Sequence, residues 1–150
     1  ILGLSVDDFD PEYPIQEVST GVYFYMVPLK TRAALKRIKV DLDKLAEYSK
    51  GRKANTPFMF CKEPENSANH AKARLMGSHE DPATGSANGC FLGYAVKHRY
   101  FGGSDVNVNV EQGAEMNRPS ILYLKGSEKG DKISVEVGGK VADVAKGELV

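Results

Sequence analysis

The sequence predicts an α+β fold in which about eight antiparallel strands form a barrel-like sheet around one central buried helix, with short helices outside. The first observation is that residues 90–96 are apolar on every face over about two turns, which describes a helix buried on all sides. The second is that strand-like segments lie on both sides of this helix. A sheet that closes around the helix accounts for both observations and removes exposed sheet edges.

The strand-like segments are short and separated by turn residues. Most of them are rich in β-branched or aromatic side chains, and several alternate polar and apolar residues. Residues 70–76 alternate in this way, which predicts a strand with one polar face. The expected strands are residues 15–19, 22–27, 57–61 and 70–76 before the central helix, and 106–110, 120–124, 133–137 and 141–145 after it.

Glycines mark the expected boundaries of these elements. Thr20-Gly21 joins the first two strands, Gly102-Gly103 ends the central helix, and Gly138-Gly139 forms a hairpin turn between the last two strands. Residues 31–51 have helical spacing and predict two short helices on an outer face of the sheet.

The second of these short helices has clear expected ends. Asp41 or Asp43 can cap its first turn, because a carboxylate accepts hydrogen bonds from the free amides there. Gly51 is expected to end it.

The length and net charge of the chain limit the classes of protein to which it can belong. The 150 residues are enough for one domain with a hydrophobic core. With 20 basic and 20 acidic residues the formal net charge is zero, which argues against nucleic acid or an anionic membrane as a partner. No signal-peptide pattern and no run of about 18 apolar residues occurs, so no membrane span is expected. The chain begins with Ile1 instead of Met, which suggests that it starts inside a longer polypeptide.

The cysteines and histidines predict neither a disulfide nor a metal site. Cys61 and Cys90 lie 29 positions apart without a CxxC motif, so we expect two small core residues in a reduced, cytoplasmic setting. His70, His79 and His98 lack the spacing of zinc ligands. His79, next to Glu80, is either an acid or base near neutral pH or a solvated loop residue.

The stretch from Glu80 to Gly89 combines two adjacent carboxylates, a proline and a run of small residues at the start of the central helix. Thr84 or Ser86 can cap that helix, and Gly85 lets the backbone approach a ligand closely. Free amides at a helix start attract anions. The stretch therefore offers a carboxylate for proton transfer beside amides for a substrate carboxylate or phosphate. The alternative is an ordinary helix start without a ligand.

These residues also carry a resemblance to a known family. The motif Glu80-Asp81-Pro82-Ala83-Thr84-Gly85-Ser86-Ala87 resembles the signature of the PhzF-like family of phenazine biosynthesis. Further stretches that fit the family are Val18-Ser19-Thr20-Gly21, Glu111-Gln112-Gly113 with Arg118-Pro119-Ser120, Val137-Gly138-Gly139-Lys140-Val141 and Gly147-Glu148-Leu149.

The resemblance implies the diaminopimelate epimerase-like fold, in which two lobes are each a barrel around a helix and the active site lies between them. Residues 1–150 match only the second, C-terminal lobe as a single unit. The family's first lobe carries a catalytic glutamate and a second small-residue helix start, and neither has a counterpart in this sequence. We therefore expect the N-terminal lobe to be absent from this chain.

The resemblance also implies a cofactor-free, carboxylate-driven isomerase. The best-known family reaction isomerises dihydro-3-hydroxyanthranilate, and the expected partner is a small carboxylate-bearing metabolite. Thr84 stands where the epimerases place one of two catalytic cysteines, and Cys90 does not replace it, so two-thiol chemistry is not favoured. The implied site residues are Asp81 and Glu80 as acid–base carboxylates, with Thr84, Gly85, Ser86, Thr20 and Gly21 as substrate-binding groups.

Two other hypotheses remain open at this stage. The chain is alternatively a non-catalytic ligand-binding or protein-interaction module that keeps the fold. It is alternatively one half of a homodimer in which two copies pair to imitate the two-lobed cleft, with two Asp81 side chains facing each other. We expect the isolated 150 residues to be inactive or nearly so, because one lobe supplies neither the second carboxylate nor the closure of the cleft.

Overall fold

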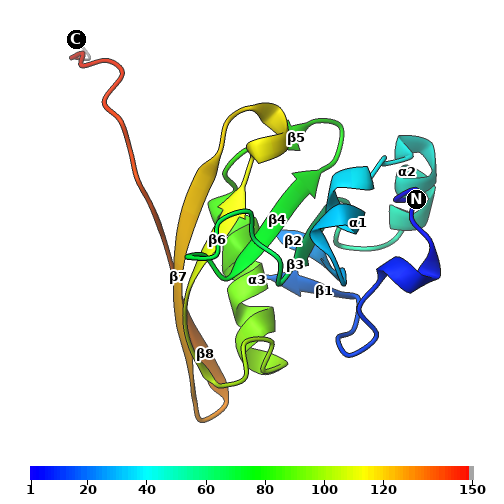
Figure 1. The fold of residues 1–150 in the computed structure, drawn as a ribbon, viewed down its shortest axis with the longest axis horizontal. Coiled ribbons are helices and arrows are strands. Elements are labelled where there is room, and N and C mark those ends of the chain that lie inside the picture. Colours follow the sequence, from blue (N-terminus) through cyan, green and yellow to red (C-terminus); the bar gives the residue numbers. More distant parts are fainter. Residues whose placement is uncertain (149–150) are drawn as a thin grey trace.

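The computed structural model describes residues 1–148 and contains one eight-stranded sheet with three α-helices and two 3₁₀ turns in that range (Figure 1). The helices are α1 (Arg32–Arg37), α2 (Leu42–Ser49) and α3 (Gly85–Lys97), and the 3₁₀ turns are Val6–Asp8 and Ala114–Met116. The strands are β1 (Gln16–Ser19), β2 (Tyr23–Pro28), β3 (Pro57–Cys61), β4 (Ala71–Met76), β5 (Glu80–Asp81), β6 (Asp105–Gln112), β7 (Ser120–Lys129) and β8 (Lys132–Gly139).

The sheet is mixed, so the antiparallel sheet predicted from the sequence is wrong in this respect. The strand order is β1-β2-β3-β4-β6-β7-β8, and β5 pairs with β4. The pairs β2–β3 and β4–β6 are parallel, and the other neighbours are antiparallel. Each parallel pair is connected through helices, α1 and α2 in the first case and α3 in the second. Such crossovers are what parallel pairing requires.

The sheet curls into a half-barrel with α3 in its hollow (Figure 1). β1 and β8 stand at the two ends of the strand order and do not pair with each other, so the barrel stays open on one side. The helix contacts strands from both ends of the sheet, namely β1 and β2 on one side and β7 and β8 on the other. The expected central buried helix is therefore confirmed, while the closed sheet around it is not.

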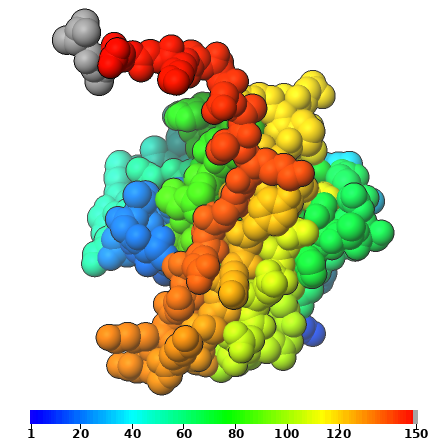
Figure 2. All heavy atoms as spheres, turned by 90° about the vertical axis from the view of Figure 1, so that its left-hand side faces the viewer, coloured from blue at the N-terminus to red at the C-terminus, as the bar shows by residue number. Residues whose placement is uncertain are grey.

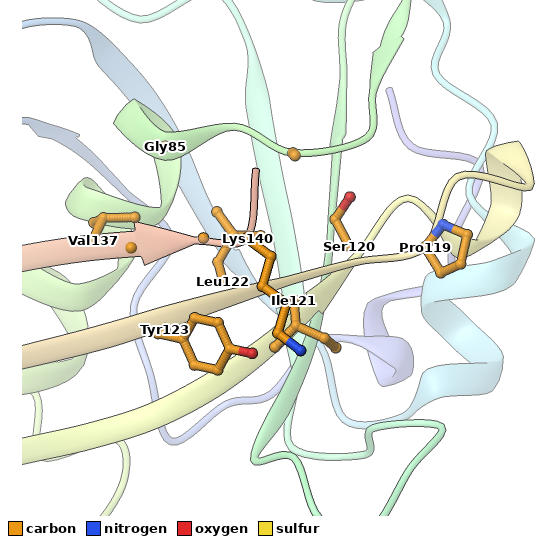
Figure 3. Close-up of a pocket in the computed structure, with 11 residues that line it drawn as sticks. Gly85, Pro119, Ser120, Ile121, Leu122, Tyr123, Val137 and Lys140 are labelled. Atoms are coloured by element: carbon orange, nitrogen blue, oxygen red, sulfur yellow. The ribbon is translucent and has the colours of Figure 1, made fainter. Parts of the chain in front are cut away.

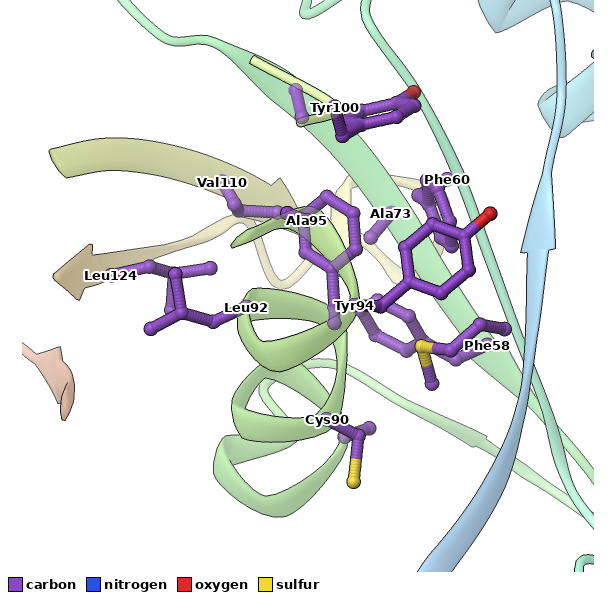
Figure 4. Packing of buried hydrophobic residues seen from close by; sticks show 14 of the residues in the cluster. Phe58, Phe60, Ala73, Cys90, Leu92, Tyr94, Ala95, Tyr100, Val110 and Leu124 are labelled. Carbon is purple, nitrogen blue, oxygen red and sulfur yellow. The ribbon is translucent and has the colours of Figure 1, made fainter. Parts of the chain in front are cut away.

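The main core lies between α3 and the inner face of the sheet (Figure 4). Residues 87–92 and 94–96 of α3 are all buried. This confirms the burial predicted for the apolar run 90–96, except that Gly93 is partly exposed. The Phe60 ring centroid lies 4.4 Å from that of Phe91 and 5.3 Å from that of Tyr100. Such pairs contribute roughly 0.5–1.5 kcal/mol each beyond their burial. Cys61 and Cys90 are both buried and free, which confirms them as core residues without a disulfide.

The helices α1 and α2 cover the outer face of the sheet over a second apolar cluster, as expected. Asp41 is the cap of α2, because its carboxylate accepts a hydrogen bond from the Lys44 amide at 3.0 Å. Gly51 follows the helix with a φ of +73°, a conformation that glycine adopts without strain. The buried members of this cluster are Leu2, Tyr25, Val27, Leu29, Ala34, Leu35, Ile38, Leu45, Ala54, Met59 and Cys61.

The polar face of β4 exists, but it is buried under neighbouring segments instead of facing solvent. Lys72 has 0% of its surface exposed, and its ammonium lies 2.9 Å from Glu65 and 2.8 Å from Glu115. Burial lowers the pKa of Lys72, but hydrogen bonds to the two carboxylates outweigh it, and the pKa lies above its ordinary value. Arg74, on the same face, is 6% exposed.

The central helix ends earlier than Gly102-Gly103, contrary to the prediction. The last helical residue is Lys97, and Arg99 then adopts a φ of +55°. The amide of Tyr100 donates to the Ala95 carbonyl at 2.9 Å, which reverses the chain at once. A non-glycine residue in the left-handed region ends the helix, a role for which glycine is the usual choice.

The final hairpin also lies elsewhere. β7 extends to Lys129, and the turn is Gly130-Asp131, since Lys129 pairs with Lys132. The pair Gly138-Gly139 lies inside β8, opposite β7, and is not a turn. The predicted strand at residues 141–145 is absent, because these residues are exposed and form no strand. Residues 141–148 project from the body (Figure 1, Figure 2). Within residues 1–148, no helix is both long and apolar enough to cross a bilayer.

Candidate active site

A short strand that the sequence did not predict fixes the motif before α3 to the sheet. In β5, Glu80 lies opposite Met76 and Asp81 lies opposite Leu75, both in β4. Pro82 follows, and Thr84 is the N-cap of α3. The sheet and the helix start therefore hold Asp81 from two sides.

Glu80 is bound by the neighbouring strand and not directed to a free space. The Arg74 guanidinium donates to both Glu80 carboxylate oxygens, from Nε at 2.7 Å and from Nη2 at 2.9 Å. Arg74 Nη1 also donates to the Leu35 carbonyl at 2.9 Å, at the end of α1. The bond to Glu80 is the main cause that raises the pKa of Arg74 above its usual range. This geometry favours a structural role for Glu80 over the predicted catalytic one.

Asp81 has a different environment. Its Oδ2 accepts a hydrogen bond from the Thr84 hydroxyl at 2.7 Å, and its Oδ1 accepts one from the Ala83 amide at 3.2 Å. Asp81 is partly exposed, while Thr84 is 9% exposed. The carboxylate therefore has a fixed direction and still reaches solvent, as a group that exchanges protons with a ligand must.

Two buried side-chain amides, those of Gln112 and Asn88, form hydrogen bonds around Asp81 and Thr84. Gln112, at the end of β6, donates from Nε2 to the Asp81 carbonyl at 2.7 Å and to the Thr84 hydroxyl oxygen at 3.0 Å. Its Oε1 accepts from the Thr84 amide at 3.3 Å and from Asn88 Nδ2 at 2.9 Å. Asn88 Nδ2 also donates to the Thr84 carbonyl at 2.9 Å. Gln112 and Asn88 are 1% and 0% exposed, so this network is shielded from water.

A cavity of about 470 Å³ lies between the start of α3, the beginning of β7 and the end of β8 (Figure 3). Ala83 and Gly85 form the helix side, and Lys140 brings a positive charge to the opposite side. The Thr84 side chain makes no capping bond to the helix, and Gly85 and Ser86 are exposed. The helix start beside the cavity therefore suits an anionic group. Its other lining residues are Pro119, Ser120, Ile121, Leu122, Tyr123, Val137, Gly138 and Gly139.

The structure places the predicted binding pair Thr20-Gly21 one helical turn farther along α3. The Thr20 hydroxyl lies 3.5 Å from Cys90 Sγ. A Cβ on Gly89 would lie 3.4 Å from the Thr20 hydroxyl and 3.8 Å from Val137, a residue that lines the cavity. Thr20 therefore belongs to the margin of the site, while Gly85 lies at the cavity itself. His79 is exposed, with Nδ1 3.2 Å from Ser78 Oγ.

The amide network was not predicted, although β6 contained a pattern that could have revealed it. Val106, Val108 and Val110 alternate with polar residues, and Gln112 continues the same register onto the inner face. A polar side chain at a buried position must find hydrogen-bond partners. That requirement predicts a buried network at the end of this strand.

Comparisons with known proteins identify a family for this chain. The profile of a family described as phenazine biosynthesis-like protein matches residues 1–147. The chain is 36% identical to an uncharacterized isomerase of Mesorhizobium japonicum, over 87% of this chain and 46% of that protein. It is 29% identical to the trans-2,3-dihydro-3-hydroxyanthranilate isomerase of Pseudomonas aeruginosa, over 90% of this chain and 47% of that protein. The chain thus spans about half the length of the relatives it matches.

A solved structure shows the same fold. The Bacillus anthracis phenazine biosynthesis protein of the PhzF family superposes with a TM-score of 0.79 at 22% identity, covering 91% of this chain and 48% of that one. At this identity the likeness establishes the fold alone.

Proposed function

This chain belongs to the phenazine biosynthesis-like, or PhzC–PhzF, family, and we propose that it forms one lobe of a cofactor-independent isomerase acting on a small carboxylate-bearing metabolite. The observation that carries the proposal is Asp81, whose carboxylate is held by Thr84 at the start of a buried helix. The cavity is lined by Ala83 and the exposed Gly85, the two neighbours of Thr84, while Asp81 is not among its lining residues. A directed carboxylate can take and return a proton, and the helix start can hold the carboxylate of a substrate.

The proposed step is a proton shift along a conjugated system. The Asp81 carboxylate takes a proton from an activated carbon, and the electron pair of that C–H bond moves into the adjacent π-system. A proton is then returned at the far end of the system, so atoms and electrons balance without a redox partner. The helix amides near Gly85 and Ser86 stabilise the substrate carboxylate throughout.

The second half of the site is proposed to come from another lobe. The chain covers 46% and 47% of two relatives named as isomerases, which supports a parent protein about twice as long. Closing a second lobe over the cavity would exclude water from Asp81. A second copy of this chain is the other candidate for that lobe, and size-exclusion chromatography with light scattering distinguishes a dimer of this chain from a monomer.

The test is solvent-deuterium incorporation into substrate by the full-length parent protein. The first probe is trans-2,3-dihydro-3-hydroxyanthranilate, because one relative is named for its isomerisation. We expect the parent protein to incorporate deuterium, Asp81→Asn to abolish incorporation, and the 150 residues alone to show almost none. Substrate binding with no exchange by the parent would overturn the proposal and favour the non-catalytic binding module instead.

A further inference from the structure

The side-chain amide of Gln112 sits between the Asp81 turn and the first turn of α3, and backbone groups fix its orientation. Its Oε1 accepts from the Thr84 amide at 3.3 Å, and a backbone amide can only donate. Its Nε2 donates to the Asp81 carbonyl at 2.7 Å, and a carbonyl can only accept. Exchanging the nitrogen and oxygen would make both contacts repulsive, so a single orientation is possible.

This orientation determines where the Thr84 hydroxyl proton points. The second hydrogen of Gln112 Nε2 is directed to Thr84 Oγ1 at 3.0 Å, so the hydroxyl oxygen is an acceptor there. The single proton of the hydroxyl is then left for Asp81 Oδ2 at 2.7 Å. A hydroxyl that is free to rotate has no such preference. The Gln112 amide therefore makes Thr84 a donor to Asp81.

Asn88 secures the same arrangement from the helix. Both hydrogens of its Nδ2 are used, one on the Thr84 carbonyl and one on Gln112 Oε1, each at 2.9 Å. Its own Oδ1 has no hydrogen-bond partner among residues 1–148, although Asn88 is fully buried. An unsatisfied buried acceptor costs free energy. That cost is tolerated because turning the amide would set its oxygen against two other oxygens.

We propose that Gln112 is the positioning residue of the site. It acts through the Thr84 hydroxyl and the Asp81 carbonyl to hold the Asp81 carboxylate in one direction toward the substrate. The inference rests on the proposed function, because it concerns how the acid–base group of that function is set. Gln112 is only 1% exposed, whereas Asp81 is partly exposed, so Gln112 is assigned no contact with substrate.

The test is the isosteric variant Gln112→Glu in the full-length parent protein, assayed by deuterium incorporation. A carboxylate has no hydrogens to donate, so the Asp81 carbonyl and the Thr84 oxygen lose their donors, and the hydroxyl is free to turn away from Asp81. We expect kcat to fall by about 100-fold, the scale of a misplaced catalytic group, with KM changed by less than about threefold. Purely lost substrate binding would instead raise KM.

The matched control is Glu111→Gln, one position away on the opposite face of β6. Glu111 accepts hydrogen bonds from the Glu65 and Asn66 amides at 2.6 and 2.9 Å and from Asn69 Nδ2 at 2.7 Å. This variant therefore also breaks a buried network, but away from Asp81. We expect it to lower the unfolding temperature and to leave kcat within about twofold.

Two variants of Thr84 keep the inference testable if Gln112→Glu does not fold. Thr84→Val keeps the shape and removes the hydroxyl, and Thr84→Ser keeps the hydroxyl. We expect the valine variant to lose at least about tenfold in kcat and the serine variant to recover most of it.

The outcomes separate the inference from the function on which it rests. Equal losses of kcat in Gln112→Glu and Glu111→Gln would mean that stability alone matters and would overturn the inference, as would full activity in Gln112→Glu or Thr84→Val. Exchange that survives in Asp81→Asn would overturn the proposed function itself. Loss in Asp81→Asn with full activity in Gln112→Glu would leave that function in place and remove only the inference.

Discussion

The ion pair between Arg74 and Glu80 provides a sharp test of the structural role of Glu80. The side chains of Arg74 and Glu80 are 7% and 16% exposed. The change Glu80→Gln keeps the shape but leaves the buried guanidinium opposite a neutral group. Breaking a buried pair from one side costs about 3–5 kcal/mol, and we take the lower end, about 3 kcal/mol, because Glu80 keeps some contact with water.

The assay is urea unfolding followed by circular dichroism, because the chain has 0 Trp residues to report by fluorescence. With a urea dependence of about 2 kcal/mol per molar for a domain of this size, the midpoint should fall by about 1.5 M. The control is Glu47→Gln, which removes one partner of a pair whose side chains are 73% and 72% exposed and should leave the midpoint unchanged. An unchanged midpoint in Glu80→Gln, together with loss of proton exchange in the parent protein, would refute the reasoning and restore the catalytic role.

Three further predictions follow from the packing and charges. Burial raises the pKa of the Cys61 thiol to about 11. The contribution of this group to stability is therefore complete at neutral pH and is lost as the pH rises through about 11. In Cys61→Ala, the urea midpoint should depend less on pH between pH 8 and 11 than in the unchanged protein. Hydrogen bonds from two lysine ammonium groups lower the pKa of Glu65 to about 2. The contribution of Glu65 to stability is therefore present above pH 4.5 and is lost as the pH falls toward 2. In Glu65→Gln, the urea midpoint should depend less on pH between pH 4.5 and 2. In Gly126→Ala the new Cβ would lie 2.9 Å from Leu92 Cγ, and we expect a loss of about 1–3 kcal/mol in urea unfolding. The control is Gly139→Ala, where no atom of the described part of the chain lies within 4 Å of the added Cβ, and we expect no loss of stability there.

The composition of the central helix predicted that it is buried, whereas the composition of the strands did not predict which strands pair. Residues 90–96 are apolar on every face, and only a fully enclosed helix accommodates that pattern. Alternation of polar and apolar residues within a strand shows which face of the strand is buried, but it does not show which other strand pairs with it. The parallel pairs could still have been inferred, since helices lie between β2 and β3 and between β4 and β6. A helical connection between adjacent strands is the mark of a parallel crossover.

The position of the last hairpin turn was predicted wrongly because of the local sequence. Gly138-Gly139 resembles a two-residue turn, but so does Gly130-Asp131, where Gly130 has a φ of +62°. The strand before the true turn ends in charged residues, so its last part, residues 125–129, did not look like a strand. Gly126 still packs against Leu92 of α3, but residues 127–129 are not buried. Their strand character comes from backbone pairing with β8 and not from apolar side chains.

The site was predicted in part because its acidic motif is local in sequence, while its support is not. Asp81, Thr84 and Gly85 are within one turn of each other along the chain, and their composition indicated a helix start with a carboxylate. Arg74 and Gln112 reach this motif from two other strands. Periodicity alone does not show which strand end lies against which turn. The contact of Arg74 with Glu80 and that of Gln112 with the Asp81 carbonyl are therefore visible only in the fold.

The end of β6 shows how three consecutive residues can fix neighbouring segments by three different means. Glu111 points outward and binds the loop at residues 65–69 through its carboxylate, and Gln112 points inward to the Asp81 turn. Gly113 contributes by lacking a side chain: its φ is +86°, and a Cβ there would lie 2.4 Å from the Arg118 carbonyl and 2.7 Å from the Pro82 carbonyl. Only glycine at position 113 allows Pro82 to come so close, because the two carbonyl oxygens belong to the backbone and cannot move away as a flexible side chain can. Gln112 and Gly113 therefore both hold the turn that contains Asp81 and Pro82, one by a hydrogen bond and the other by close backbone packing, while Glu111 binds a separate loop.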